Sequence, residues 1–366
     1  MRENAVSVGA RARPRLSLAK KSEPAGRAPS QGLAQTNAWR LLGWLAGVAI
    51  LVLACLLSLA IGAKDIPFGT VWDALWSYNN SNDHIVIRDL RIPRTVLGLI
   101  VGMALGICGA LIQAMTRNPL ADPGILGVNA GAAFAVALAV GVLGFSTIWA
   151  YIWFAFAGAI VVSVVVYALG SVGRGGATPI RLTLSGVAVG AMLTGVTSGL
   201  ILLDPIAFDQ MRNWSAGTIA GRGLDVSGAI APFVVVGLLL AFAIARPLNA
   251  VAMGDDLARS LGANVTRTRV IGVVAVTLLC GAATAAAGPI AFVGLMVPHV
   301  ARWIVGPDQR WIMAYTLVGA PILLLVSDVI GRVVVRPGEM PVGVVTAFVG
   351  APVLIFLVRR SKVSAL

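Results

Sequence analysis

Residues 94–115 read RTVLGLIVGMALGICGALIQAM and carry a single charge, Arg94, at their first position. An α-helix rises about 1.5 Å per residue, so this stretch is long enough to cross the roughly 30 Å hydrocarbon core of a bilayer. Small residues on one helical face let two backbones approach closely in lipid. Such a stripe recurs here at three- and four-residue steps: Gly98, Gly102, Gly106 and Gly109. The segment therefore predicts a tightly packed transmembrane helix.

The whole chain resembles this segment in composition. Hydrophobic residues make up 58% of its 366 positions, charged residues only 12%, and the mean hydropathy is +0.90. These values indicate an all-α integral membrane protein rather than a water-soluble domain. Ten spans are predicted in total: 39–61, 94–115, 124–143, 146–169, 178–203, 226–246, 267–287, 290–305, 311–335 and 341–358.

A second glycine stripe lies in the span 178–203, at Gly186, Gly190, Gly195 and Gly199. Each stripe on its own has two interpretations, a close contact within one subunit or a contact between two copies. We favour packing within one subunit for both stripes.

Basic residues decide the expected orientation, because short cytoplasmic loops collect Lys and Arg. Eight precede Leu41 and three follow the last span, and an even number of spans places both termini on one side. With both termini cytosolic, twenty of the 28 basic residues lie inside. The net charge of +13 then reflects loops beside an anionic leaflet and implies no nucleic-acid partner.

Two regions follow from this pattern. Residues 1–38 are rich in Arg, Pro, Ser and Ala and have no apolar run, which predicts a disordered basic cytosolic tail. Residues 39–360 form the membrane domain. We expect no cleaved signal peptide, since the first apolar run is too long and further spans follow it.

Residues with catalytic or ligating chemistry are sparse. Cys55, Cys108 and Cys280 all fall inside apolar spans, and the two histidines, His84 and His299, have no second ligand at helical spacing. We expect no metal site and no cofactor. None of the four lysines closes a phosphate-binding loop, so active transport would draw its energy from a partner protein.

Two other classes of function stay open at this point. An ion-coupled secondary transporter usually keeps ionisable groups near the midplane, whereas the charges here lie near the span ends. An intramembrane hydrolase would need His299 beside a nucleophile such as Ser185 or Ser198, and no motif pairs them.

One polar island, GDDLARSLG at residues 254–262, separates two apolar spans on the predicted cytosolic side. Acidic residues suit a helix N-terminus and glycine suits a helix end, so the island predicts a helix of about two turns. Such a short helix is not stable alone. It either docks a partner protein or lies as a connector on its own membrane domain.

Several motifs together resemble the membrane permeases of ABC importers for iron siderophores, haem and cobalamin, over roughly residues 40–360. They are RIPR at 91–94, NPLADPGILG at 118–127, the island at 254–262, GPIAFVGL at 288–295 with Pro298, His299 and Arg302, SDVIGR at 327–332 and EMPVGVVT at 339–346. Their order and spacing carry the resemblance.

The resemblance implies a ten-helix subunit of the bacterial cytoplasmic membrane, paired with a second permease copy around a central pathway. Two cytosolic ABC ATPase subunits and an extracytoplasmic substrate-binding protein complete the importer. Ferric siderophores are the expected substrate, with haem or cobalamin as alternatives within the same family.

Site residues follow from the same resemblance. Arg91, Arg94 and Arg332 match arginines that dock the binding protein, where guanidinium groups bind carboxylates bidentately. The alternative is that Arg94, at a helix end, and Arg332, next to Asp328, snorkel or are paired within the fold. Asn118, Leu120 and Thr178 match a cytosolic gate. The ATPase-coupling helix comprises Gly254, Asp255, Asp256, Leu257, Ala258, Arg259, Ser260, Leu261 and Gly262, within about 253–263.

Overall fold

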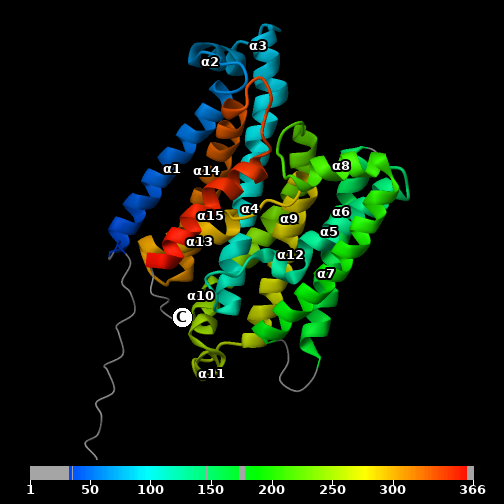
Figure 1. The fold of residues 1–366 in the computed structure, drawn as a ribbon. Coiled ribbons are helices and arrows are strands. Elements are labelled where there is room, and N and C mark those ends of the chain that lie inside the picture. Colours follow the sequence, from blue (N-terminus) through cyan, green and yellow to red (C-terminus); the bar gives the residue numbers. More distant parts are fainter. Residues whose placement is uncertain (1–32, 35, 146, 173–177, 361–366) are drawn as a thin grey trace, which may run out of the picture. The chain divides into compact units, whose positions relative to one another are not determined.

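The computed structural model describes residues 33–34, 36–145, 147–172 and 178–360, and in these residues all regular structure is helical (Figure 1). Seven helices are long and apolar enough to cross a membrane. They are α1 (Asn37–Ala60), α4 (Ile92–Thr116), α6 (Ile148–Ser171), α7 (Pro179–Leu203), α9 (Leu224–Ala243), α12 (Val265–Ala287) and α14 (Gln309–Val334). Three shorter apolar helices are α5 (Val128–Gly141), α13 (Val293–Val305) and α15 (Val342–Arg360).

A helix lies at each of the ten predicted spans, so the predicted all-helical membrane fold is confirmed. Two helices start later than predicted, for local backbone reasons. Gly127 adopts a left-handed φ of 71° between the 3-10 turn η2 (Pro123–Leu126) and α5. Phe292, with φ of 68°, sets the start of α13 after the non-helical segment 288–291.

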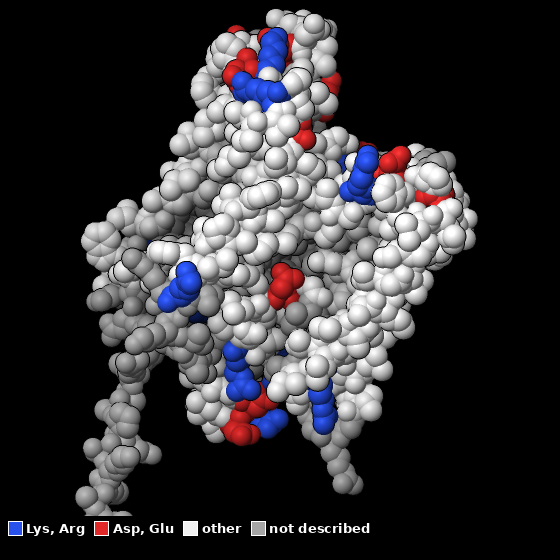
Figure 2. Space-filling view, viewed as in Figure 1, with Lys and Arg blue, Asp and Glu red and all other residues white. Residues whose placement is uncertain are grey.

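Helices α4 and α12 form the centre of the described fold. Helix α4 packs against α14, α12, α13 and α9, and most of its side chains are buried. By contrast, α1 and α7 leave most of their apolar surface uncovered. An apolar exterior is what a lipid environment or a second subunit requires. In agreement, Figure 2 shows Lys, Arg, Asp and Glu gathered mainly over α2–α3, α8 and α10–α11, with a mostly uncharged surface between them.

Glycines explain how closely α4 approaches its neighbours. A Cβ on Gly102 would lie 2.6 Å from the Cα of Pro321 in α14, and a Cβ on Gly109 would overlap the Gly294 carbonyl in α13. The first stripe therefore packs within the subunit, as predicted. The α7 stripe differs, because Cβ atoms on Gly195 and Gly199 would meet no atom within 4 Å in the described chain. For those two positions the prediction of packing within the subunit is wrong.

Short helices lie between the predicted spans, and the sequence analysis predicted only the one within residues 254–262. Helices α2 (Phe68–Trp76), α3 (Asn82–Ile85) and the π-helical turn η1 (Val86–Arg91) lie beyond one end of α1, and η1 continues into α4 (Figure 1). Helix α8 (Pro205–Ser215) follows α7. Helices α10 (Ala245–Met253) and α11 (Asp255–Ser260) lie at the opposite end of the bundle from α2. We refer to these two ends as the α2 end and the α11 end.

The predicted tail, residues 1–38, lies almost entirely outside the described residues. At its end, Leu33 and Ala34 donate backbone N–H groups to the Trp303 and Ile304 carbonyls, at 3.4 and 2.9 Å. Thr36 then caps the N-terminus of α1 by accepting from Trp39 N. The first helix therefore begins at Asn37, before the predicted start of the first span.

Candidate functional site

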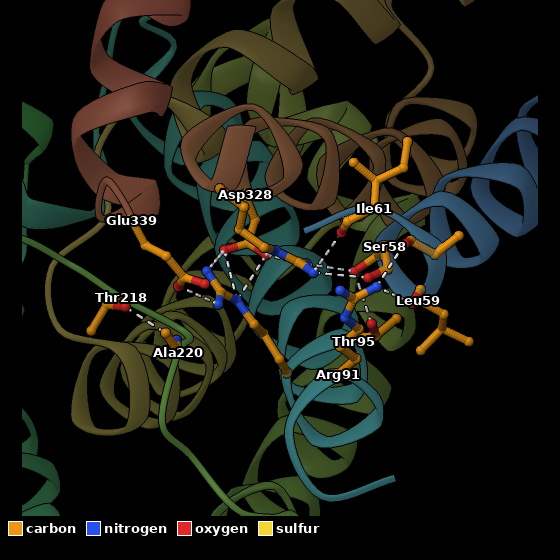
Figure 3. Close-up of polar contacts among 12 residues, drawn as sticks. Ser58, Leu59, Ile61, Arg91, Thr95, Thr218, Ala220, Asp328 and Glu339 are labelled. Carbon is orange, nitrogen blue, oxygen red and sulfur yellow. Dashed lines mark hydrogen bonds and ion pairs between the residues drawn. The ribbon is translucent and has the colours of Figure 1, made fainter. Parts of the chain in front are cut away.

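A buried ion-pair cluster joins α4 and α14 at the α2 end (Figure 3). Arg94, at the start of α4, donates from Nε to both carboxylate oxygens of Asp328, at 3.0 and 2.9 Å, and from Nη2 to Oδ1 at 2.7 Å. Arg332, one turn after Asp328 in α14, donates from Nε to its Oδ2 at 2.9 Å. Asp328 is 0% exposed, so a single buried carboxylate is shared by two guanidinium groups.

The Arg94 guanidinium has one further acidic partner. Its Nη1 donates to Glu339 Oε2 at 2.6 Å, and the Glu339 side chain is 38% exposed whereas that of Arg94 is only 10% exposed. Glu339 lies on the loop between α14 and α15, which is also held by the Met340 N–H to the Gly331 carbonyl. Glu339 is thus the solvent-facing member of the cluster.

Arg332 and Arg91 also hold the C-terminal end of α1. The four last carbonyls of a helix lack partners within it, and cationic side chains are favourable there. Arg332 donates to the Ser58 and Ile61 carbonyls at 2.8 and 3.2 Å, and to Ser58 Oγ at 2.8 Å. Arg91 donates to the Leu59 and Ala60 carbonyls at 2.7 and 2.6 Å. The cluster therefore fastens α1 to α4 and α14.

The three arginines matched to binding-protein docking are thus buried, with exposures of 5% for Arg91, 9% for Arg94 and 2% for Arg332. Their hydrogen bonds follow the alternative interpretation, pairing within the fold; docking stays a prediction. The sequence analysis missed Ser58 and Glu339 as partners. The spacing of Asp328 and Arg332 by four residues was a usable signal for their ion pair, because residues i and i+4 lie on one helical face.

The coupling island forms the short helix α11, whose two sides differ in their contacts. Asp255 Oδ1 accepts from Arg269 Nη2 of α12 at 2.8 Å, and Ala258 is fully buried. Asp256 is fully exposed beside Arg259, at 3.3 Å. Leu257 and Leu261 are 47% and 62% exposed. The island therefore has a held side, which packs on the chain's own α10 and α12, and a free side that carries two exposed leucines.

Two glycines bound this helix. Gly254 has φ of 122° and Gly262 has φ of 81°, backbone angles that favour glycine. A Cβ on Gly254 would also lie 3.5 Å from Arg117 Nη1, at the end of α4. The ordered part of the predicted helix is Asp255–Ser260, and the glycines form the turns that connect it to α10 and α12.

The residues matched to a gate lie on separate segments. Asn118 Oδ1 accepts from Leu120 N at 2.9 Å in the turn after α4, and Leu120 is 43% exposed. Thr178 caps α7 by accepting from Arg181 N at 3.4 Å. The segments are brought near each other by helix packing, because α7 contacts both α4 and η2, which follows the Asn118 turn. A gate formed by all three stays a prediction.

His299 has no serine partner in the described residues. Its Nδ1 is buried without a hydrogen bond, and no hydrogen bond joins it to Ser185 or Ser198. Among the described residues, no group of three or more His, Cys, Asp and Glu side chains is arranged to hold a metal ion. The geometry therefore gives the hydrolase alternative no catalytic pair.

Comparison with known proteins decides the class. A family model described as the FecCD transport family matches residues 50–360. The chain belongs to the FecCD transport family. Across this FecCD chain, 311 residues are 51% identical to the ferric enterobactin transport system permease protein FepD of Escherichia coli (strain K12), covering 85% of the chain and 93% of FepD.

Two further relatives show the breadth of the family. The hemin transport system permease protein HmuU of Yersinia pestis is 36% identical over 333 residues, which cover 88% of the FecCD chain and 96% of HmuU. A solved metal-chelate type ABC transporter in an inward-facing conformation matches the fold with a TM-score of 0.77 and 23% identity, covering 87% of the FecCD chain and 99% of that structure.

These findings confirm the predicted class: the FecCD chain is a membrane permease of the type II ABC importer kind, a multi-pass protein of the bacterial cytoplasmic membrane. It is a transport subunit, and its family works with ATPase and substrate-binding partners. The secondary-transporter and hydrolase alternatives are set aside on this evidence.

Proposed function

We propose that this FecCD permease imports ferric siderophores, with ferric enterobactin as the first chelate to test. The observation that carries the proposal is the 51% identity to FepD, against 36% to the hemin permease HmuU. Import proceeds by alternating access through a pathway between two permease copies. Substrate choice rests mainly with the binding protein, because the described spans offer apolar and small side chains rather than convergent polar groups.

The decisive experiment is uptake by cells that lack this protein. Ferric enterobactin, hemin and cobalamin are supplied in turn to deletion cells with and without the wild-type gene. Restored uptake of ferric enterobactin alone supports the proposal. A defect confined to hemin or cobalamin assigns the permease to that ligand instead, and no defect for any of the three contradicts iron-siderophore import.

In this proposal the α11 end is cytosolic, and the partner ATPase acts on the permease at that end. The free side of α11, with Asp256, Leu257 and Leu261, is the surface offered to an ATPase subunit. The held side connects the helix to the membrane domain through the Asp255–Arg269 ion pair. A push on the free side therefore passes into α10 and into α12, one of the two central helices.

Asp256→Lys is expected to reduce co-purification of the ATPase about tenfold or more. The change reverses a fully exposed charge at the contact surface and places a cation at a helix N-terminus, where positive charge is unfavourable. Membrane insertion should not change, because the Asp256 side chain is fully exposed and, in the part of the chain that the structure describes, pairs with Arg259 alone. The amount of ATPase retained by the tagged permease measures the effect.

Asp209→Lys is the matched control for this variant. Asp209 and Arg212 in α8 form an exposed pair at the same i,i+3 spacing, 3.5 Å apart, away from the α11 end. Reversal of its charge should leave ATPase binding unchanged. Equal retention of the ATPase by both variants would remove α11 as the coupling surface.

The binding protein docks at the α2 end in this proposal, with Arg94 as the central contact and Arg91 and Arg332 behind it. Because Arg94 is buried, a carboxylate of the binding protein reaches it by replacing Glu339, the exposed acidic partner. Guanidinium groups bind carboxylates in fixed fork geometry, so one carboxylate can substitute for another without movement of Asp328.

Glu339→Gln is therefore expected to strengthen docking. The variant removes the internal competitor, and a half-exposed ion pair contributes up to about 1 kcal/mol, so the half-saturating concentration of binding protein should fall about two- to fivefold. Uptake by proteoliposomes titrated with the loaded binding protein measures this change.

Asp65→Asn provides the control at the same end of the molecule. Asp65 pairs with Arg336 at 2.7 Å and is exposed, but it does not contact Arg94. The control should leave the titration unchanged. An unchanged titration with Glu339→Gln as well would show that docking does not use Arg94.

A further inference from the structure

Helix α2 presents an aromatic face that no other part of the described chain covers. Phe68, Trp72 and Trp76 follow one another at four-residue steps and are 55%, 64% and 74% exposed. The two indole rings lie 5.8 Å apart between centroids. On the other side of the helix, Val71 and Ala74 are buried in a small cluster with Ile66 and Ile87. The helix thus has two apolar faces, one inside the fold and a second one outside it.

The orientation of this aromatic face is fixed by the fold. Arg88 of η1 donates to the Ala74 and Leu75 carbonyls at 2.8 and 3.1 Å, which satisfies the C-terminal end of α2. Its guanidinium carbon also lies 4.4 Å from the centre of the Tyr78 ring. Because α2 is held by its buried face and by Arg88, the aromatic residues cannot simply turn inward.

The neighbouring helix identifies the surroundings of this face. Helix α1 ends at Ala60, and only seven residues separate it from α2. Its exposed side chains towards that end are apolar, including Leu53 and Leu56. In a multi-pass membrane protein an apolar helix surface of this kind suits contact with acyl chains. Helix α2 lies crosswise beyond this end of α1 (Figure 1). The end of a spanning helix is the level at which the acyl region gives way to headgroups.

Residue chemistry favours the same surroundings. Trp is enriched where membrane meets water, since its ring is apolar but its N–H needs a polar partner. The remaining exposed edge of α2 carries Asp73, which suits the aqueous side. A protein partner is a weaker fit, because a nine-residue helix is only about 14 Å long and a stable interface buries about 800 Å² on each side.

We propose that α2 is an in-plane membrane anchor, with Phe68, Trp72 and Trp76 inserted at the headgroup–acyl boundary of the leaflet at the α2 end. The partner is the lipid surface itself. Through Arg88 and η1, the anchor holds the start of the long helix that continues into α4. This inference does not depend on which chelate the permease carries or on the docking and coupling proposals.

Spin labels at adjacent positions of α2 test the anchor. Trp72→Cys and Asp73→Cys are each made in a Cys55→Ala background, where the remaining thiols, Cys108 and Cys280, are buried. The labelled proteins are placed in nanodiscs of phosphatidylethanolamine and phosphatidylglycerol. Oxygen should relax the label at position 72 more than a water-soluble nickel chelate does, and the order should reverse at position 73. Stronger relaxation by the nickel chelate at both positions would overturn the proposal and leave the face free for a protein partner.

A second measurement avoids labels on the anchor. Dibrominated phosphatidylcholine in the nanodiscs quenches Trp fluorescence near the bilayer. The intensity lost to quenching should fall when Trp72 and Trp76 are both replaced by Phe, whereas Trp214→Phe, at a buried position, should leave it unchanged. An equal loss of intensity in wild type and in the Trp72→Phe, Trp76→Phe variant would also overturn the proposal.

Discussion

Asp328→Ala is expected to lower the free energy of unfolding by about 3–5 kcal/mol, the cost of removing one partner from a buried ion pair. The carboxylate is fully buried and is shared by Arg94 and Arg332. Without it, two guanidinium groups face each other in an apolar bundle, and only Arg94 retains a carboxylate partner, Glu339. The fraction of monodisperse protein that survives heating in detergent measures the loss.

Two further variants separate charge from packing at this site. Asp328→Asn keeps the side-chain shape and an acceptor oxygen but removes the charge, so it should lie between wild type and Asp328→Ala. Asp65→Ala breaks an ion pair at the same end of the molecule but in an exposed position, where such pairs contribute little. If Asp328→Ala and Asp65→Ala lose monodisperse protein at the same temperature, the buried cluster does not stabilise the fold.

Gly109→Ala is expected to lower the free energy of unfolding by about 1–3 kcal/mol or more, because overpacking forces backbone shifts. Its new methyl group would overlap the Gly294 carbonyl, and that carbonyl belongs to a backbone, which cannot turn aside as a flexible side chain does. The contact is equally tight from the other side, where a Cβ on Gly294 would lie 2.6 Å from the Leu105 carbonyl oxygen. Helices α4 and α13 would have to separate.

Gly199→Ala is the matched control, since it makes the same chemical change on an apolar helix. A Cβ at Gly199 meets nothing within 4 Å in the described chain, and Ala exceeds Gly in helix propensity by up to about 1 kcal/mol. Detergent-solubilised Gly199→Ala should therefore be at least as stable as wild type. The same loss of stability for both substitutions would contradict the close-contact account of α4.

Sequence reasoning succeeded where one local property decides the structure. Length and apolarity alone determine whether a segment such as 94–115 can cross a bilayer, so the positions of the ten helices were predictable. The acidic start of residues 255–260 and the glycines around it likewise predicted a helix there. Helices α2 and α8 were missed because a short helix depends on tertiary contacts rather than on its own propensity.

The site was only partly predictable for a similar reason. The motifs selected Arg94 and Arg332, but whether they point outward or share Asp328 depends on how α4 and α14 are rotated about their axes. A linear pattern does not contain that rotation. Likewise, nothing in the spacing of Asp255 and Arg269 indicated which of the two adjacent aspartates would pair with α12.

The contact between Arg332 and the end of α1 has a consequence for biosynthesis. The Ser58 carbonyl accepts from a residue 274 positions further along the chain. A ribosome that inserts helices in order releases α1 into the membrane long before Arg332 exists. Arg91 can already bind the Leu59 and Ala60 carbonyls, but the Ser58 carbonyl must rely on water or headgroups in the meantime. The first helix is therefore among the last to be fully fastened, and truncation of the chain before α14 should leave it loosely attached to an otherwise assembled bundle.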